Sequence, residues 1–171
     1  MTLAIFILGA PGIGKTTLVR EFLAGEQLTF VEKPKWTLAS DFCAAGHYKG
    51  TTFDGGDTVP YTGAADALEY WSANLLHLPY VIFDGDRFST RPSLEIVSEH
   101  AQVIGFHLHA DDNLLDDRRE ERMSNQNETW MRGRVTKARN FATVIQAHDL
   151  DASATPGELA EMVRAAVRRA L

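Results

Sequence analysis

Cysteine and long apolar stretches are both scarce in this chain. One thiol, Cys43, among 171 residues leaves no internal disulfide to form, which indicates a reducing compartment. The apolar segment 3–8 is far shorter than the ~20 residues of a membrane span, and no basic segment precedes it. We interpret it as a buried strand rather than a signal peptide, and we expect a cytoplasmic protein that does not enter a membrane.

Positive charge is also in short supply. The chain has 17 Lys and Arg residues against 23 Asp and Glu residues, for a formal net charge of −6. General adhesion to nucleic acid relies on cations that neutralise phosphates, so the composition argues against it. Segment 118–139 is the exception, with seven basic residues against three acidic ones. Such a run is either a solvated helix face or a set of arginines that folds over a bound triphosphate.

The pattern of apolar segments predicts an α/β fold, with a mainly parallel sheet flanked by helices. A length of 171 residues with 44% hydrophobic residues predicts one domain over the whole chain. We expect strands at 3–8, 42–48, 80–84 and 103–108, a possible short strand at 29–32, and an extended piece at 150–152. We expect helices at 15–23, 64–77, 92–100, 111–123 and 128–147, and a last helix that begins at Pro156 with Thr155 as its N-cap.

The most informative motif directly follows the first predicted strand. Residues 9–16 fit the pattern G-x-x-x-x-G-K-[ST], in which glycines let backbone N–H groups turn inward around phosphate oxygens at a helix N-terminus. Lys15 would reach the β- and γ-phosphates of a nucleotide, and Thr16 would hold Mg²⁺. The predicted nucleotide contacts are Gly9, Pro11, Gly12, Ile13, Gly14, Lys15, Thr16 and Thr17.

A second motif ends the predicted strand 80–84. Asp84 stands at the carboxyl end of this apolar strand, where a carboxylate beside a phosphate loop fixes Mg²⁺. The plain alternative is a turn-forming Asp-Gly pair. Asp86 lies two residues further on, so one carboxylate could hold the metal while the other accepts a proton from an attacking hydroxyl. The sequence leaves open which does which, and whether Arg87 clamps an acceptor phosphate or pairs with its acidic neighbours.

Residues 46–61, which we call the glycine-rich loop, combine aromatic and hydrogen-bonding side chains. This mixture suits a site that stacks a planar base and reads its edge. Asp54 and Asp57 could instead stabilise turns, and His47 could be structural rather than a base. The predicted acceptor-binding residues are His47, Tyr48, Phe53, Asp54, Asp57, Tyr61 and Arg87.

The basic segment predicts a lid over about residues 111–141. Closure of two such helices over a nucleotide would expel water and bring arginines to the transferring phosphate. The predicted catalytic residues are Lys15, Asp84, Asp86, Arg118, Arg122, Arg132 and Arg134.

Together these motifs resemble those of small P-loop kinases that act on nucleosides and nucleoside monophosphates. The chain is more closely similar to phage kinases that phosphorylate 5-hydroxymethyluracil bases in DNA. That likeness is carried by Ala45-Gly46-His47-Tyr48-x-Gly50-x-x-Phe53-Asp54-Gly55-x-Asp57-Thr58-Val59-x-Tyr61 and by Gln126-Asn127-Glu128-x-Trp130-x-x-Gly133-Arg134-x-Thr136-Lys137.

The resemblance implies ATP with Mg²⁺ as the phosphate donor, a base hydroxymethyl group in DNA as the acceptor, and the host cytoplasm as the site of action. The acceptor base would have to leave the duplex stack, and the acidic chain would engage DNA only transiently. Two alternatives stay open. One is a kinase for free deoxynucleosides or their monophosphates, and the other is a nucleotide-dependent switch that hydrolyses its triphosphate.

Overall fold

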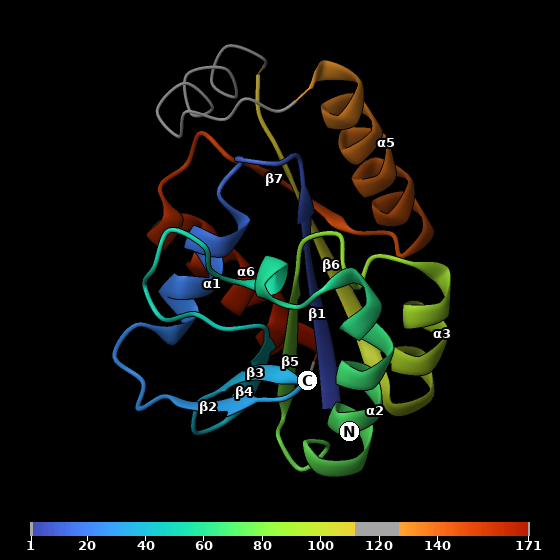
Figure 1. Cartoon of the computed structure of the whole chain (residues 1–171). Helices are drawn as coiled ribbons and strands as arrows, with labels where there is room; N and C mark the ends of the chain where they lie inside the picture. Colours follow the sequence, from blue (N-terminus) through green and yellow to red (C-terminus); the bar gives the residue numbers. More distant parts are fainter. Residues whose placement is uncertain (1, 112–126, 171) are drawn as a thin grey trace.

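The computed structural model describes residues 2–111 and 127–170, and these form a seven-stranded sheet with helices on both faces (Figure 1). The strand order is β2-β3-β4-β5-β1-β6-β7. The strands are β1 (Thr2–Gly9), β2 (Thr29–Glu32), β3 (Lys35–Leu38), β4 (Phe42–Ala45), β5 (Tyr80–Asp84), β6 (Ala101–His109) and β7 (His148–Asp151). The helices are α1 (Lys15–Leu23), α2 (Ala64–Asn74), α3 (Arg91–His100), α5 (Glu128–Val144) and α6 (Pro156–Ala170).

The sheet is mainly parallel, which confirms the predicted fold class. Strands β4, β5, β1, β6 and β7 pair in parallel, whereas β2, β3 and β4 pair antiparallel at one edge. The sequence analysis missed β3, which begins directly after Pro34. The predicted strand 42–48 is shorter in the structure, because the chain leaves the sheet at Gly46, whose φ is +99°.

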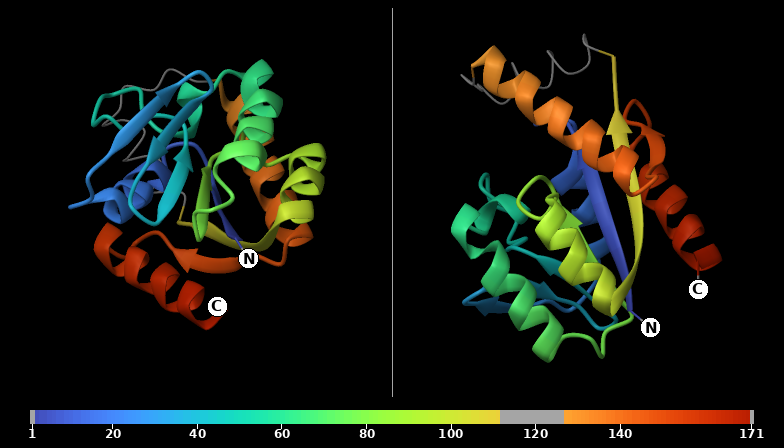
Figure 2. Two further views of the ribbon diagram at one scale, coloured as in Figure 1. Left: turned by 90° about the horizontal axis from the view of Figure 1, so that it is seen from below. Right: turned by 90° about the vertical axis from the view of Figure 1, so that its right-hand side faces the viewer.

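Helices cover the two faces of the sheet with separate apolar layers (Figure 2). Helices α1 and α6 pack on one face through side chains such as Leu18 and Val163. Helices α2, α3 and α5 pack on the other face, where Trp71 and Phe141 meet the rings that β1 and β5 present. Every residue of β1 is buried, as expected for a central strand covered on both faces.

The predicted helices agree with the structure at most of their ends. Helix α1 has the predicted bounds, and α6 begins at Pro156 after a capping box in which Thr155 Oγ1 and Glu158 Oε2 lie 2.8 Å apart. The predicted helix 64–77 ends earlier, at Asn74, and the helix 128–147 ends at Val144. The predicted helix 111–123 lies outside the described residues apart from its first position.

Helix α5 packs closely on the sheet at its carboxyl end. A Cβ atom at Gly105 of β6 would lie 2.4 Å from Ile145 Cδ1, so the end of α5 sits directly on the strand. Residues 128–130 at the start of α5 are exposed, whereas Met131, Ala138, Phe141 and Ala142 are buried. Among the described helices, none has the length and apolar character needed to cross a membrane.

Candidate active site

The segment between β1 and α1 forms a phosphate-binding loop at the carboxyl edge of the sheet. Gly12 and Gly14 take positive φ values of 82° and 111°, which lets the backbone wrap at the start of α1. The Lys15 ammonium donates to the carbonyl oxygens of Gly9 at 3.1 Å and Ala10 at 2.9 Å, so it lies across the loop. Loop amides at a helix N-terminus, with a lysine beside them, make a site for a polyphosphate.

Asp84 lies next to this loop because β5 pairs with β1. The register sets Asp84 opposite Ile7, two residues before the loop begins. Its Oδ2 atom accepts a hydrogen bond from Thr16 Oγ1 at 2.8 Å and one from the Tyr48 hydroxyl at 3.3 Å. Burial raises the pKa of the Asp84 carboxyl above its usual range, although the Lys15 charge opposes this effect.

A hydroxyl and a carboxylate at hydrogen-bond distance beside a phosphate loop fit a Mg²⁺ site. Within residues 2–111 and 127–170 there is no group of three or more His, Cys, Asp or Glu residues placed to hold a metal. Mg²⁺ commonly takes only one or two protein ligands and completes its shell with water and substrate phosphates. Thr16 and Asp84 are therefore the residues that would hold it.

The glycine-rich loop folds against the back of this Thr16–Asp84 pair. The Asp54 carboxylate accepts hydrogen bonds from the backbone N–H groups of Lys49 and Gly50. It also forms an ion pair with Arg20 of α1, with Arg20 Nη2 2.7 Å from Asp54 Oδ2. Next to it, Gly55 packs so closely that a Cβ atom would lie 2.9 Å from Asp84 Oδ2 and from Thr16 Oγ1. Asp54 thus fastens the loop to the helix that follows the phosphate loop.

This packing divides the predicted acceptor-binding residues into two groups. Phe53, Asp57 and Tyr61 line the pocket, together with Arg87. His47, Tyr48 and Asp54 lie behind it and are buried, with His47 Nε2 at 2.8 Å from the Val31 carbonyl oxygen. The structure gives these three side chains internal partners rather than a place on the pocket wall.

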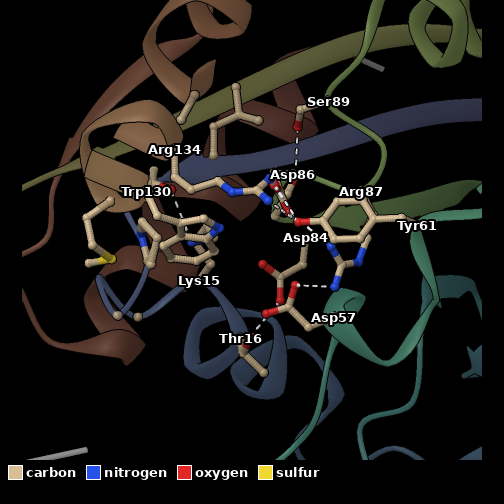
Figure 3. A pocket seen from close by; sticks show the side chains of 18 of the residues that line it. Lys15, Thr16, Asp57, Tyr61, Asp84, Asp86, Arg87, Ser89, Trp130 and Arg134 are labelled. Carbon is tan, nitrogen blue, oxygen red and sulfur yellow. Dashed lines mark hydrogen bonds and ion pairs between the residues drawn. The ribbon is translucent and has the colours of Figure 1, made fainter. Parts of the chain in front are cut away.

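The pocket itself is a cavity of about 370 Å³ between the phosphate loop, the end of β5 and α5 (Figure 3). Lys15, Thr16 and Asp84 form its floor, and Trp130 and Arg134 of α5 border it on the other side. The rings of Phe53, Tyr61 and Trp130 are exposed by 67%, 55% and 40%. The site therefore combines a polyphosphate cradle with aromatic surfaces near its entrance.

A cluster of charged groups surrounds Asp86. Arg134 forms an ion pair with its carboxylate, Arg87 lies 3.9 Å from it, and Lys137 Nζ lies 4.0 Å from Oδ2 and 2.9 Å from the Asp86 carbonyl oxygen. The Arg87 guanidinium stacks on the Tyr61 ring at 3.4 Å and donates through Nε to the Val59 carbonyl oxygen at 2.9 Å. We call Arg87, Arg134 and Lys137 the cation cluster.

Only one of the four predicted lid arginines is seen in the pocket. Arg134 borders it, whereas Arg132 points elsewhere and pairs with Glu128 at 3.6 Å on the exposed side of α5. Arg118 and Arg122 lie outside the described residues. The sequence analysis missed Trp130 and Lys137, although the spacing 130-134-137 places them on one helix face with Arg134.

No model of a known protein family matches this sequence, and no curated protein sequence matches it. Similar solved structures do exist. The tunicamycin resistance protein of Deinococcus radiodurans has a TM-score of 0.59 at 17% identity, over 98% of this chain and 96% of that one. A gluconokinase from Sinorhizobium meliloti has a TM-score of 0.58 at 13% identity, over 97% and 91%.

A third similar structure is the deoxyadenosine kinase of M. mycoides with bound dATP, with a TM-score of 0.56 at 12% identity, over 96% of this chain and 99% of that one. Likeness at such low identity concerns the fold alone. This chain therefore shares its fold with these three solved structures, two of which are named as kinases.

Proposed function

We propose that this protein is a kinase that transfers the γ-phosphate of ATP to a hydroxyl group. The observation that carries the proposal is one pocket lined by Lys15, the Thr16–Asp84 pair, Arg87 and Arg134. Phosphoryl transfer depends on positioning and on stabilisation of the charge that spreads over the γ-phosphate oxygens. A phosphate loop on one side and arginines on the other provide both.

The chain's own residues divide this work. The loop amides and Lys15 bind the β- and γ-phosphates and stabilise the phosphate in transfer. Bound Mg²⁺, held by Thr16 and Asp84, would neutralise phosphate charge. The acceptor oxygen forms a bond to the γ-phosphorus while the bond from that phosphorus to the bridging oxygen breaks, and ADP leaves. We assign the acceptor's proton to Asp86, because Asp84 would hold Mg²⁺ together with Thr16.

For the acceptor we propose the 5-hydroxymethyl group of 5-hydroxymethyluracil in phage DNA. The exposed rings of Phe53, Tyr61 and Trp130 support a planar base as the group that enters the pocket. Such a base would have to be flipped out or single-stranded to meet the γ-phosphate in line.

A free deoxynucleoside or deoxynucleoside monophosphate is the second candidate acceptor. The deoxyadenosine kinase among the similar structures favours it, and so does the place of Arg87 in the pocket. The same rings and cations would then hold a single nucleotide rather than a base within a strand.

The test is a transfer assay with γ-phosphate-labelled ATP on four acceptor sets. These are DNA that contains 5-hydroxymethyluracil, ordinary DNA, free deoxynucleosides, and deoxynucleoside monophosphates. Label on the modified DNA alone supports the proposed acceptor, and label on free compounds supports the second candidate. Release of labelled phosphate with no labelled acceptor would overturn the kinase proposal in favour of a nucleotide-dependent switch. The Lys15→Met variant is the control, because it should transfer no label to any acceptor.

A further inference from the structure

We propose that the cation cluster is a binding subsite for a phosphate group of the acceptor, which displaces the Asp86 carboxylate from the same three cations. The inference rests on the proposed function and narrows its substrate class. It requires an acceptor that carries a phosphate monoester or diester near the hydroxyl, and it disfavours neutral nucleosides and sugars.

The first argument is the number of cations that meet at one carboxylate. Arg87 comes from the turn after β5, and Arg134 and Lys137 come from successive turns of α5. All three contact Asp86. The other carboxylate near them, Asp57, reaches only Arg87, at 3.8 Å, and its side chain is 63% exposed. Among the described residues that pair here, three cations therefore meet two carboxylates.

The lowered pKa of Lys137 agrees with three cations lying close together. Its side chain is 34% exposed, and its pKa is lowered first by burial and then by the charges of Arg134 and Arg87. An ammonium beside two guanidinium groups gains when an anion with more charge or more acceptor oxygens than one carboxylate enters. A phosphate is such an anion.

The second argument is that contacts with the glycine-rich loop fix the position of the Arg87 side chain. Its Nε atom is used by the Val59 carbonyl oxygen and its plane is stacked on Tyr61, both in the glycine-rich loop, and its side chain is only 13% exposed. Its two terminal nitrogens lie 3.9 Å from Asp86 and 3.8 Å from Asp57, which both line the pocket, and a guanidinium fork suits bidentate contact with a phosphate. The donor phosphates have their own cradle in the loop with Lys15, so we assign the cluster to the acceptor.

The arrangement also links acceptor binding to the proton transfer. While the three cations hold it, the Asp86 carboxylate is not free to accept the proton of a hydroxyl. A phosphate that takes over all three cations releases this carboxylate beside the acceptor. The enzyme would then favour transfer to an anionic acceptor over transfer to water.

The experiment measures binding to the whole protein by calorimetry, with ADP and Mg²⁺ present to fill the donor site. The probes are thymidine, thymidine 5′-monophosphate and the dinucleotide thymidylyl-thymidine, so that neutral, monoester and diester ligands are compared. We expect either phosphate compound to bind at least about tenfold more tightly than thymidine. The stronger of the two identifies the source of the phosphate.

Three variants locate the subsite. Lys137→Met should abolish most of the preference for the phosphate compounds, because Lys137 contacts Asp86. Arg139→Met should not change it, because Arg139 is an exposed residue of α5 that lines a separate hollow with His107 and Thr143. Asp86→Asn should tighten binding of the phosphate compounds, because it removes the competing carboxylate. A purely structural role for Asp86 would give the opposite sign.

Several results would overturn the inference. These are equal affinities for the three probes, no binding of any probe, equal losses in Lys137→Met and Arg139→Met, or weaker phosphate binding by Asp86→Asn. The transfer assay shows whether the subsite or the kinase proposal fails. Transfer with no preference for phosphate-bearing acceptors would refute the subsite and leave the kinase proposal intact. Phosphate binding with no transfer would support the subsite and refute the kinase proposal.

Discussion

Gly55 shows how closely the site is built at the scale of single residues. It has φ 82° and ψ −157°, a combination open essentially to glycine alone, and it faces the Thr16–Asp84 pair. We predict that Gly55→Ala destabilises the protein by about 2 kcal/mol or more, from backbone strain and from contact with both proposed Mg²⁺ ligands. Labelled transfer should also need more Mg²⁺ for half-maximal rate.

Gly50→Ala is the matched control for this variant. Gly50 has a similar φ of 77°, but nothing lies within 4 Å of the position of its missing Cβ. It should therefore show a loss of stability without a changed Mg²⁺ requirement. Equal Mg²⁺ requirements in the two variants would refute the contact argument. Chemical denaturation and a Mg²⁺ titration of transfer supply the two readouts.

Asp84 gives a second prediction at this scale. Because burial raises its pKa in the folded state, the folded chain holds this proton more tightly than the unfolded chain. Stability then falls as pH rises from the ordinary carboxyl pKa to the raised one, and the cost is complete above that window. Asp84→Asn should thus raise the melting temperature of the ligand-free protein at pH 7, and it should abolish transfer. A lower melting temperature would contradict this reasoning.

Which of these residues could be found from the sequence depends on how local their signals are. The phosphate loop and the strand-end Asp84 follow from patterns within a few residues of an apolar strand. The alternation of aromatic and polar residues in the glycine-rich loop did not show which side chains face inward. Tyr48 and Asp54 are buried by contacts with Asp84 and Arg20, which lie 36 and 34 residues away in sequence.

At the scale of elements, the glycine-rich loop behaves as one piece that Asp54 holds to α1. Asp54→Ala removes the acceptor for two backbone N–H groups and for Arg20, so we expect a loss of about 2 to 3 kcal/mol in unfolding free energy. Transfer should fall further than stability explains, because the loop also supports Asp84.

Glu26→Ala is the comparison for Asp54→Ala, since Glu26 bonds only to Ser40 on the exposed surface. It should change unfolding free energy by less than about 0.5 kcal/mol. If urea denaturation gives Asp54→Ala and Glu26→Ala the same unfolding free energy, Asp54 does not anchor the loop.

Element prediction succeeded where periodicity was strong and failed where the chain turns quickly. Helix α1 and strand β5 were found with their bounds, because caps and apolar periods agree there. Strand β3 was missed because Pro34 disfavours a strand at its start and four residues carry little alternation. Lys137 was overlooked because the basic segment was analysed for its net charge and not for which of its residues share one face of the helix.

At the scale of the whole molecule, the negative charge limits how the protein meets a strand of DNA. The chain carries −6 overall, and three cations are gathered at the acceptor end of the pocket. For single-stranded DNA with 5-hydroxymethyluracil, we expect log affinity to fall with log salt at a slope near −0.7, since the subsite neutralises one phosphate and each phosphate contributes about −0.7.

Fluorescence anisotropy over a salt series measures this slope, and Lys137→Met should reduce its magnitude. Arg139→Met serves again as the variant that should leave the slope unchanged. A much steeper slope in the unmodified protein would mean that a longer track of phosphates is bound, in conflict with the small subsite.

The close contact between Gly105 of β6 and Ile145 lies at the carboxyl end of α5. Trp130 lies about 22 Å from this contact along the helix, at 1.5 Å per residue. If α5 tilted by about 10° about this contact, Trp130 would move by about 4 Å, and Lys137, which lies halfway along the helix, would move by about half as much. A small rotation about the contact at Gly105 would thus move the α5 residues that border the pocket much further than the contact itself.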